Sequence, residues 1–138
     1  MKFDFTKYQK IQSRSVTADY FNGEKGCGGM ATEGMGKVPS GDLGQTFKIS
    51  PCVCVAKQSS FTICDIHGSG EVNHIWMTCA PTGFDGFTIE FYYDGASFPS
   101  VSLPLGKLFA VGYDQKSIVN SLMVTVNPAG GMNLYWPI

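Results

Sequence analysis

Short runs of β-branched and aromatic residues, separated by glycine and proline, constrain the fold of this chain most. The 138 residues include 17 glycines and 7 prolines, which interrupt the sequence at short and fairly regular intervals. The runs between them are rich in Val, Ile, Thr, Phe and Tyr, and no stretch shows a convincing amphipathic helical pattern. This spacing is typical of an antiparallel sandwich, jelly roll or barrel. We therefore expect a single all-β domain over residues 1–138.

Individual strands follow from the same runs. Residues 61–66 and 71–78 form a predicted hairpin around a turn at residues 67–70. Residues 87–93 are the clearest strand because they end at Asp94-Gly95, a dipeptide that favours a tight turn. The other expected strands are 52–56, 100–103, 121–126 and 132–136, and residues 105–111 fit a single helical turn.

Residues 22–44 differ from the rest of the chain because they contain eight glycines in 23 residues. Loops of this length without secondary structure are usually functional or disordered. We expect this segment at an interface or over a binding surface.

The composition limits the classes of partner. Hydrophobic residues make up 43% of the chain and charged residues only 15%, well below the usual quarter. We interpret the low charge as a sign that a partner covers part of the surface. The net charge of −1 leaves no basic stripe, so nucleic-acid binding is not expected. No apolar run is long enough to span a membrane and the N-terminus lacks a secretory pattern, so we expect a cytoplasmic location and no membrane partner.

The five cysteines are odd in number and include no Cys-x-x-Cys pair. Cys52 and Cys54 face the same side of their predicted strand, because alternate residues of a strand share a face. We interpret all five as small buried hydrophobic residues in a reducing compartment.

Metal and nucleophile chemistry have little support in the sequence. Asp65, His67 and His74 belong to one predicted hairpin, where structural hydrogen bonds explain them better than metal ligation does. With only two histidines, both beside that hairpin, a Cys or Ser nucleophile lacks a base and an orienting residue. Residues 34–38 lack the hydroxyl residue of a phosphate loop. We expect no metal and no cofactor.

Carboxylates and aromatic rings offer a better route to a ligand. Glu90 shares one face of its predicted strand with Thr88 and Tyr92, where it would meet a sugar if that face is concave and serve solubility if it faces solvent. Aromatic rings stack on the apolar faces of sugars, although most of those here suit the core. Trp136, near the end of the chain, is the ring that we expect to be exposed or covered by a neighbour.

Several motifs occur in one order along the chain. They include GEKGCGGMA at 23–31, DIHGSG at 65–70, FYYDG at 91–95 and NPAGGMN at 127–133. In this order they resemble the N-terminal half of the domain-of-unknown-function 2961 family, which includes glycoside hydrolase family 172. The resemblance extends from about residue 13 to the end of the chain.

The resemblance implies an antiparallel β-sandwich with a single jelly roll. Full-length members of the family carry two jelly rolls and assemble as trimers or larger rings. They act on fructofuranose- and arabinofuranose-type glycosides with two glutamates of the second jelly roll, and those segments have no counterpart here. No residue of this chain is therefore expected to be catalytic.

Two functions follow from these expectations. The first is a non-catalytic assembly module that forms a homo-oligomer, a trimer or a multiple of it. The alternative is a carbohydrate-active protein that binds or hydrolyses fructo- or arabinofuranosides at a subunit boundary. The candidate sugar contacts are Asn22, Glu24, Lys25, Glu90 and Trp136. Fold analogy also allows a role in a capsid-like shell.

Overall fold

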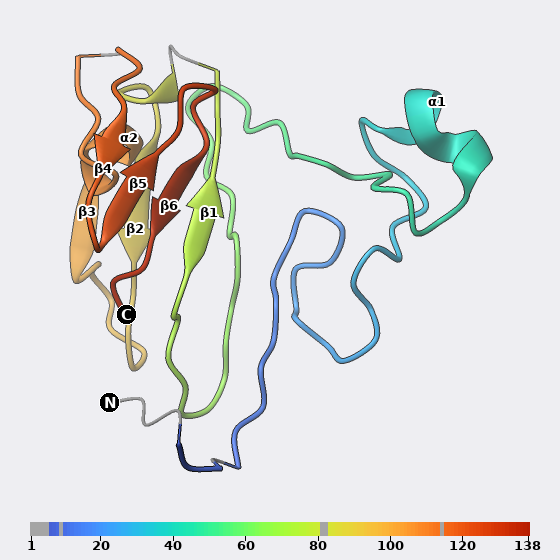
Figure 1. Cartoon of the computed structure of the whole chain (residues 1–138), viewed down its shortest axis with the longest axis horizontal. Coiled ribbons are helices and arrows are strands. Elements are labelled where there is room, and N and C mark those ends of the chain that lie inside the picture. Colours follow the sequence, from blue (N-terminus) through green and yellow to red (C-terminus); the bar gives the residue numbers. More distant parts are fainter. Residues whose placement is uncertain (1–5, 9, 81–82, 114) are drawn as a thin grey trace. The chain divides into compact units, whose positions relative to one another are not determined.

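The computed structural model describes residues 6–8, 10–80, 83–113 and 115–138. It contains two compact units, residues 1–68 and residues 69–138 (Figure 1). The second unit holds every named strand, and the first holds one short α-helix, one 3-10 turn and irregular chain. The expectation of a single domain over residues 1–138 stays a prediction.

A four-stranded antiparallel sheet forms one layer of the second unit. Its order is β1-β6-β5-β4, with β1 at Ile75–Met77, β6 at Met132–Leu134, β5 at Val124–Val126 and β4 at Val119–Asn120 (Figure 1). A turn at residues 127–131 connects β5 to β6, closed by a 2.9 Å hydrogen bond from the Gly130 amide to the Asn127 carbonyl oxygen. This is the turn that the Pro- and Gly-rich sequence predicts.

A two-stranded antiparallel sheet forms the other layer. Its strands are β2 (Thr88–Phe91) and β3 (Val101–Pro104), and α2 (Leu105–Leu108) follows β3 directly. The turn after β2 contains Asp94 and Gly95 with φ values of 52° and 71°. The Asp-Gly dipeptide therefore adopts the positive φ angles that its sequence predicts.

The core lies between the two sheets. Ile89 of β2 is buried between exposed Thr88 and Glu90, and Val126 and Leu134 reach the same cluster from the other sheet. The remaining buried members of the cluster are Phe84, Leu105, Phe109, Val111 and Met132. Burial of each such side chain contributes about 1.5–3 kcal/mol of favourable transfer free energy, so this cluster holds the two sheets together.

The first unit is built differently. Its regular elements are α1 (Lys37–Ser40), η1 (Gly41–Leu43) and an isolated bridge between Thr17 and Tyr20. Ile49 is the one buried hydrophobic side chain of this unit among the described residues. The unit therefore lacks an apolar core of the kind found in the second unit.

The all-β class and the antiparallel pairing are confirmed, but several predicted strands are wrong in extent. No strand forms at residues 52–56 or 61–66, and the predicted hairpin of 61–66 with 71–78 is absent, since the one strand of that region is Ile75–Met77, which pairs with β6. The strands predicted at 87–93 and 132–136 are shorter than predicted, the one at 121–126 begins only at Val124, and the one at 100–103 forms one residue later, at Val101–Pro104. The helical turn predicted at 105–111 forms as α2.

The predicted burial of the cysteines is also wrong. Cys52, Cys54 and Cys64 are exposed, while Cys27 and Cys79 are half-buried. The reason is the missing strands, because residues 52–64 pack into no sheet that would cover their side chains. Within the described chain, no helix has the length and apolar character needed to cross a bilayer.

Candidate functional site

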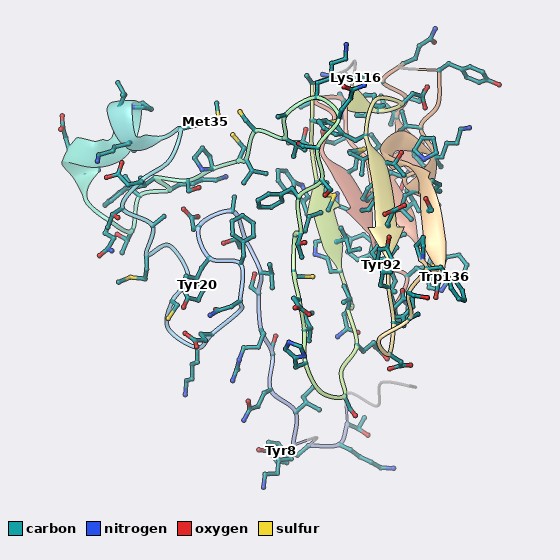
Figure 2. The ribbon with its side chains drawn as sticks, turned by 180° about the vertical axis from the view of Figure 1, so that it is seen from behind. Tyr8, Tyr20, Met35, Tyr92, Lys116 and Trp136 are labelled. Atoms are coloured by element: carbon teal, nitrogen blue, oxygen red, sulfur yellow. The ribbon has the colours of Figure 1, made fainter. Side chains whose placement is uncertain are left out.

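Three side chains of the first unit form a closed hydrogen-bonded group. The Tyr20 hydroxyl donates to Glu24 Oε2 at 2.8 Å and accepts from Asn22 Nδ2 at 3.1 Å. The Glu24 backbone amide donates to Asn22 Oδ1 at 3.0 Å. We call Tyr20, Asn22 and Glu24 the loop cluster; Tyr20 is labelled in Figure 2. The cluster offers a phenol, an amide and a carboxylate on an exposed surface.

The local backbone brings these side chains together. The Thr17–Tyr20 bridge, with backbone hydrogen bonds of 3.0 and 3.1 Å, reverses the chain just before the cluster. Gly23 follows with a φ of 66°, and a Cβ there would lie 3.4 Å from Val16 Cγ2. A glycine between Asn22 and Glu24 thus permits the left-handed turn that lets both flanking side chains meet Tyr20.

The hydrogen bond to Glu24 affects the pKa of the Tyr20 hydroxyl. The hydrogen bond to Glu24 raises the pKa of Tyr20, whereas the bond donated by Asn22 lowers it, with the Glu24 effect the larger. The Cys27 thiol lies 3.8 Å from Glu24 Oε2 and 4.0 Å from the carbonyl oxygen of Lys25. Lys25 thus enters this group through its backbone. Tyr20 is the member that the sequence reasoning missed.

Glu90 occupies a second polar group on the outer face of the β2–β3 sheet. Its carboxylate accepts from the Tyr92 hydroxyl at 2.9 Å and from the Ser102 hydroxyl at 3.0 Å. Ser102 lies directly opposite Glu90 in the register of the two strands. The bond to Glu90 raises the pKa of Tyr92, with smaller contributions from desolvation and from the Glu90 charge. The sequence placed Tyr92 beside Glu90 but did not identify Ser102.

Aromatic rings cover the outer face of the four-stranded sheet. The imidazole of His74 stacks on the ring of Tyr135, with centroids 4.8 Å apart. His74 Nε2 also lies 3.0 Å from Asn133 Oδ1, and Trp76 pairs with Asn133 in the β1–β6 register. Trp76 and Tyr135 are both about half exposed. Exposed aromatic rings of this kind can stack on the apolar face of a sugar or pack against a protein.

Trp136 stands where the edge of this sheet is irregular. Val72 and Ile138 exchange backbone hydrogen bonds of 2.7 and 3.0 Å, while Ile75 pairs with Leu134. Between these two pairs, residues 135–137 lie opposite residues 73–74, so the strand that contains Trp136 has one extra residue, as in a β-bulge. Trp136 is 63% exposed, which agrees with the sequence expectation. Figure 2 shows Trp136 and Tyr92 toward the same end of the strands.

The structure groups the sequence-predicted residues in two sets. Asn22 and Glu24 belong to the loop cluster of the first unit, and Lys25 follows them in the chain. Glu90 and Trp136 belong to the second unit, with Glu90 bound by two hydroxyls.

The two histidines, His67 and His74, contact different residues. His67 Nε2 lies 3.7 Å from Asp65 Oδ2, whereas His74 contacts Asn133 and Tyr135. In the part of the chain that the structure describes, no three His, Cys, Asp or Glu side chains gather in a way that would hold a metal.

A hollow of about 530 Å³ lies beside α2 in the second unit. Its lining combines the carboxylate of Asp85 and the ammonium of Lys107 with apolar Pro104 and Val111. None of the sequence-predicted contacts lines this hollow.

Comparison with known proteins identifies one family. The family model described as the GH172 first beta-sandwich domain matches residues 40–138, well over half of the chain. The matched residues include Glu90 and Trp136, whereas the loop cluster precedes them. No curated protein matches the chain.

Proposed function

Because this chain belongs to glycoside hydrolase family 172 through its first β-sandwich domain, we propose that it is a non-catalytic assembly module that forms a homo-oligomer. A retaining glycosidase needs two carboxyl groups about 5–5.5 Å apart. The carboxylate of Glu90 is instead held by the hydroxyls of Tyr92 and Ser102. Among the described residues, Glu90 is thus held by hydroxyl groups of its own sheet rather than paired with a second carboxylate.

The observation that carries the proposal is an exposed apolar segment without a strand partner. Residues 51–66 have the sequence pattern of two strands but pair with no strand among the residues that the structure describes. Val53, Phe61, Ile63 and Ile66 of this segment are all exposed, Ile66 by 60%. Contiguous apolar side chains on a surface mark sites of association.

A second copy of this chain is the partner that we propose. Extended segments with free backbone groups add readily to an exposed sheet edge, where main-chain hydrogen bonds supply affinity. The small share of charged residues, 15%, leaves few like charges to oppose the contact between copies. We propose a trimer or a multiple of it, as the family resemblance implies.

Light scattering coupled to size-exclusion chromatography tests the proposal at micromolar concentration. The native chain should elute as an oligomer. Ile63→Asp places a charge in the apolar segment and should weaken association by at least about tenfold, because burying an unpaired charge costs more than 1.4 kcal/mol. Ser60→Asp is the matched control, since Ser60 is an exposed polar residue of the same segment.

Two results would contradict the assembly function. One is a native chain that stays a strict monomer across the micromolar range. The other is equal dissociation by the Ile63 and Ser60 variants, which would show that added charge alone, and not loss of the apolar contact, disrupts the oligomer.

Carbohydrate binding is the second candidate, and the loop cluster favours it. Amide and carboxylate groups that are already oriented by hydrogen bonds suit the hydroxyls of a sugar. We propose a fructo- or arabinofuranoside as the ligand, with Asn22 and Glu24 as contacts and Lys25 beside them. Trp136 and Glu90 are the corresponding candidates in the second unit.

Titration with a fructofuranoside and an arabinofuranoside, followed by the NMR signal of the backbone amide of residue 24, tests this candidate. Saturable shifts should be lost in Asn22→Ala and Glu24→Gln and kept in Asp42→Asn, an exposed acid outside the cluster. Unchanged amide signals and unchanged fluorescence of Trp76 and Trp136 at high glycoside concentration would remove it.

A further inference from the structure

Three sulfur atoms from two segments of the first unit meet at one point. The Cys52 and Cys54 thiols each lie 3.4 Å from the thioether sulfur of Met35. One residue separates the two cysteines, so both thiols reach the same sulfur from one short stretch of chain. The three side chains are exposed and therefore open to a solute. We call Met35, Cys52 and Cys54 the sulfur cluster.

The backbone fixes Met35 over the cysteines. The Gly36 amide donates to the Ile49 carbonyl oxygen at 2.8 Å, which ties residues 34–36 to the chain just before Cys52. A Cβ on Gly36 would lie 2.5 Å from the Lys48 carbonyl oxygen, and one on Gly34 would lie 2.5 Å from that of Ile49. Glycine on both sides of Met35 is therefore required for the close approach. Met35 is labelled in Figure 2.

The distances suit a shared metal ion. Two sulfurs that bind one ion lie at most about 4.6 Å apart, twice the usual metal–sulfur bond length. Both thiol–thioether separations are well inside this limit. A thiol already drawn to a thioether needs little movement to share an ion with it.

The chemistry of the donors selects the ion. Thiolate and thioether sulfur are soft ligands, and cysteine with methionine is a set that favours Cu(I). Structural zinc sites are almost always four-coordinate and use cysteine, histidine or carboxylate ligands, and a thioether suits zinc less well. We propose that Met35, Cys52 and Cys54 form a three-coordinate Cu(I) site.

Binding at this site is a ligand exchange without electron transfer. Two thiols lose their protons to solvent, and two thiolates and one thioether then bind Cu(I). The affinity should therefore rise with pH, because protons compete with the metal for the thiolates. The site shares residues 51–66 with the proposed assembly segment, but it uses the thiols of that segment, whereas assembly depends on its apolar side chains.

Anaerobic titration of the purified chain with Cu(I), in competition with a coloured Cu(I) chelator and with a phosphine reductant present, tests the site. One tightly bound ion per chain is expected. Cys52→Ser or Cys54→Ser should each lower the affinity by at least about 100-fold, because loss of a ligand exceeds the effect of losing a supporting residue. Met35→Leu should lower it by about tenfold, because a neutral thioether binds Cu(I) more weakly than a thiolate does.

Cys64→Ser is the matched control. Cys64 is exposed like Cys52 and Cys54, but desolvation and then the charge of Asp65 raise the pKa of its thiol. This substitution should leave the affinity unchanged. Circular dichroism of each variant shows whether it folds, and X-ray absorption of the copper-loaded chain should show sulfur ligands alone.

Either of two results would overturn the proposal. The first is an affinity that falls equally in the Cys64 and Cys52 variants, which would indicate nonspecific thiol binding. The second is a ligand shell of the bound copper dominated by nitrogen or oxygen.

Discussion

The imidazole of His74 lies almost parallel to the phenol ring of Tyr135, with an interplanar angle of 8° and centroids 4.8 Å apart. The two residues flank β1 and β6, and His74 Nε2 is also 3.0 Å from Asn133 Oδ1. The stack and the polar contact thus join the same two strands on the face of the sheet opposite the core. Cross-strand pairs of this kind are the unit that stabilises a sheet.

A double-mutant cycle with His74→Ala and Tyr135→Ala should reveal this pairing. We expect a coupling free energy of about 0.5–1.5 kcal/mol, the range for paired rings beyond their area burial. Urea denaturation monitored by fluorescence of Trp76 and Trp136 provides the free energies of unfolding. Tyr113→Ala removes a ring that is 91% exposed and should change stability by less than about 0.5 kcal/mol. Additive effects of the two substitutions would contradict the stacking.

The loop cluster predicts opposite effects of two neighbouring substitutions on one phenol. Glu24→Gln should lower the pKa of Tyr20, because the carboxylate that accepts its hydrogen bond raises that pKa. Asn22→Ala should raise it further, because the amide donor that stabilises the phenolate is removed. Carbon NMR of labelled tyrosine across a pH titration, with Tyr20→Phe for assignment, measures both shifts. Shifts of the same sign would contradict the described geometry.

The Tyr92–Glu90 hydrogen bond should stabilise the fold at neutral pH but not at high pH. The pKa of Tyr92 is raised in the folded chain, so its contribution is fully present below the unfolded value of about 10. The contribution is lost as the pH rises through the raised value. Tyr92→Phe should therefore be less stable than the native chain at neutral pH, and the difference should shrink at high pH.

Denaturation of both proteins at a series of pH values measures this effect. Ser102→Ala provides the control, because it removes the other hydroxyl on Glu90 but leaves the titrating phenol in place. The difference in the free energy of unfolding between Ser102→Ala and the native chain should not shrink at high pH.

Gly36 should tolerate no side chain. Gly36→Ala brings a Cβ within 2.5 Å of the Lys48 carbonyl oxygen, so the chain must shift and weaken the hydrogen bond to Ile49. Crowding of this kind costs about 1–3 kcal/mol, and the Gly36 amide should exchange its hydrogen about tenfold faster or more. Gly28→Ala should leave that exchange rate unchanged, because a Cβ at Gly28 meets no atom within 4 Å. Equal effects would show that the close approach is absent.

The sequence predicted the second unit well because its local signals agree with its pairing. Ile89 alternates with exposed neighbours, and Asp94-Gly95 supplies the turn. Residues 61–66 carry an equally strong pattern and form no strand. Periodicity reports which face of a segment is apolar, but a strand also needs a partner, and that partner is not encoded in the segment itself.

In the candidate sites, too, contacts within one segment could be predicted from the sequence, whereas contacts between separate segments could not. Asn22 and Glu24 were predicted as sugar contacts because they lie in one loop. Tyr20, Asn22 and Glu24 are each two residues apart, and this local spacing could have identified Tyr20 as a third member. Ser102 became a partner of Glu90 only through the register of β2 and β3, which join residues twelve positions apart. The approach of Met35 to Cys52 depends likewise on contacts between separate segments.

Ile49 alone, among the described hydrophobic side chains of residues 1–68, is buried. Ordering the backbone costs about 1–2 kcal/mol per residue, and one buried isoleucine offsets little of that cost. In the proposed assembly, a second copy of the chain would supply part of the folding free energy that this half lacks. By mass action, the thermal midpoint of the assembled chain should then rise with protein concentration.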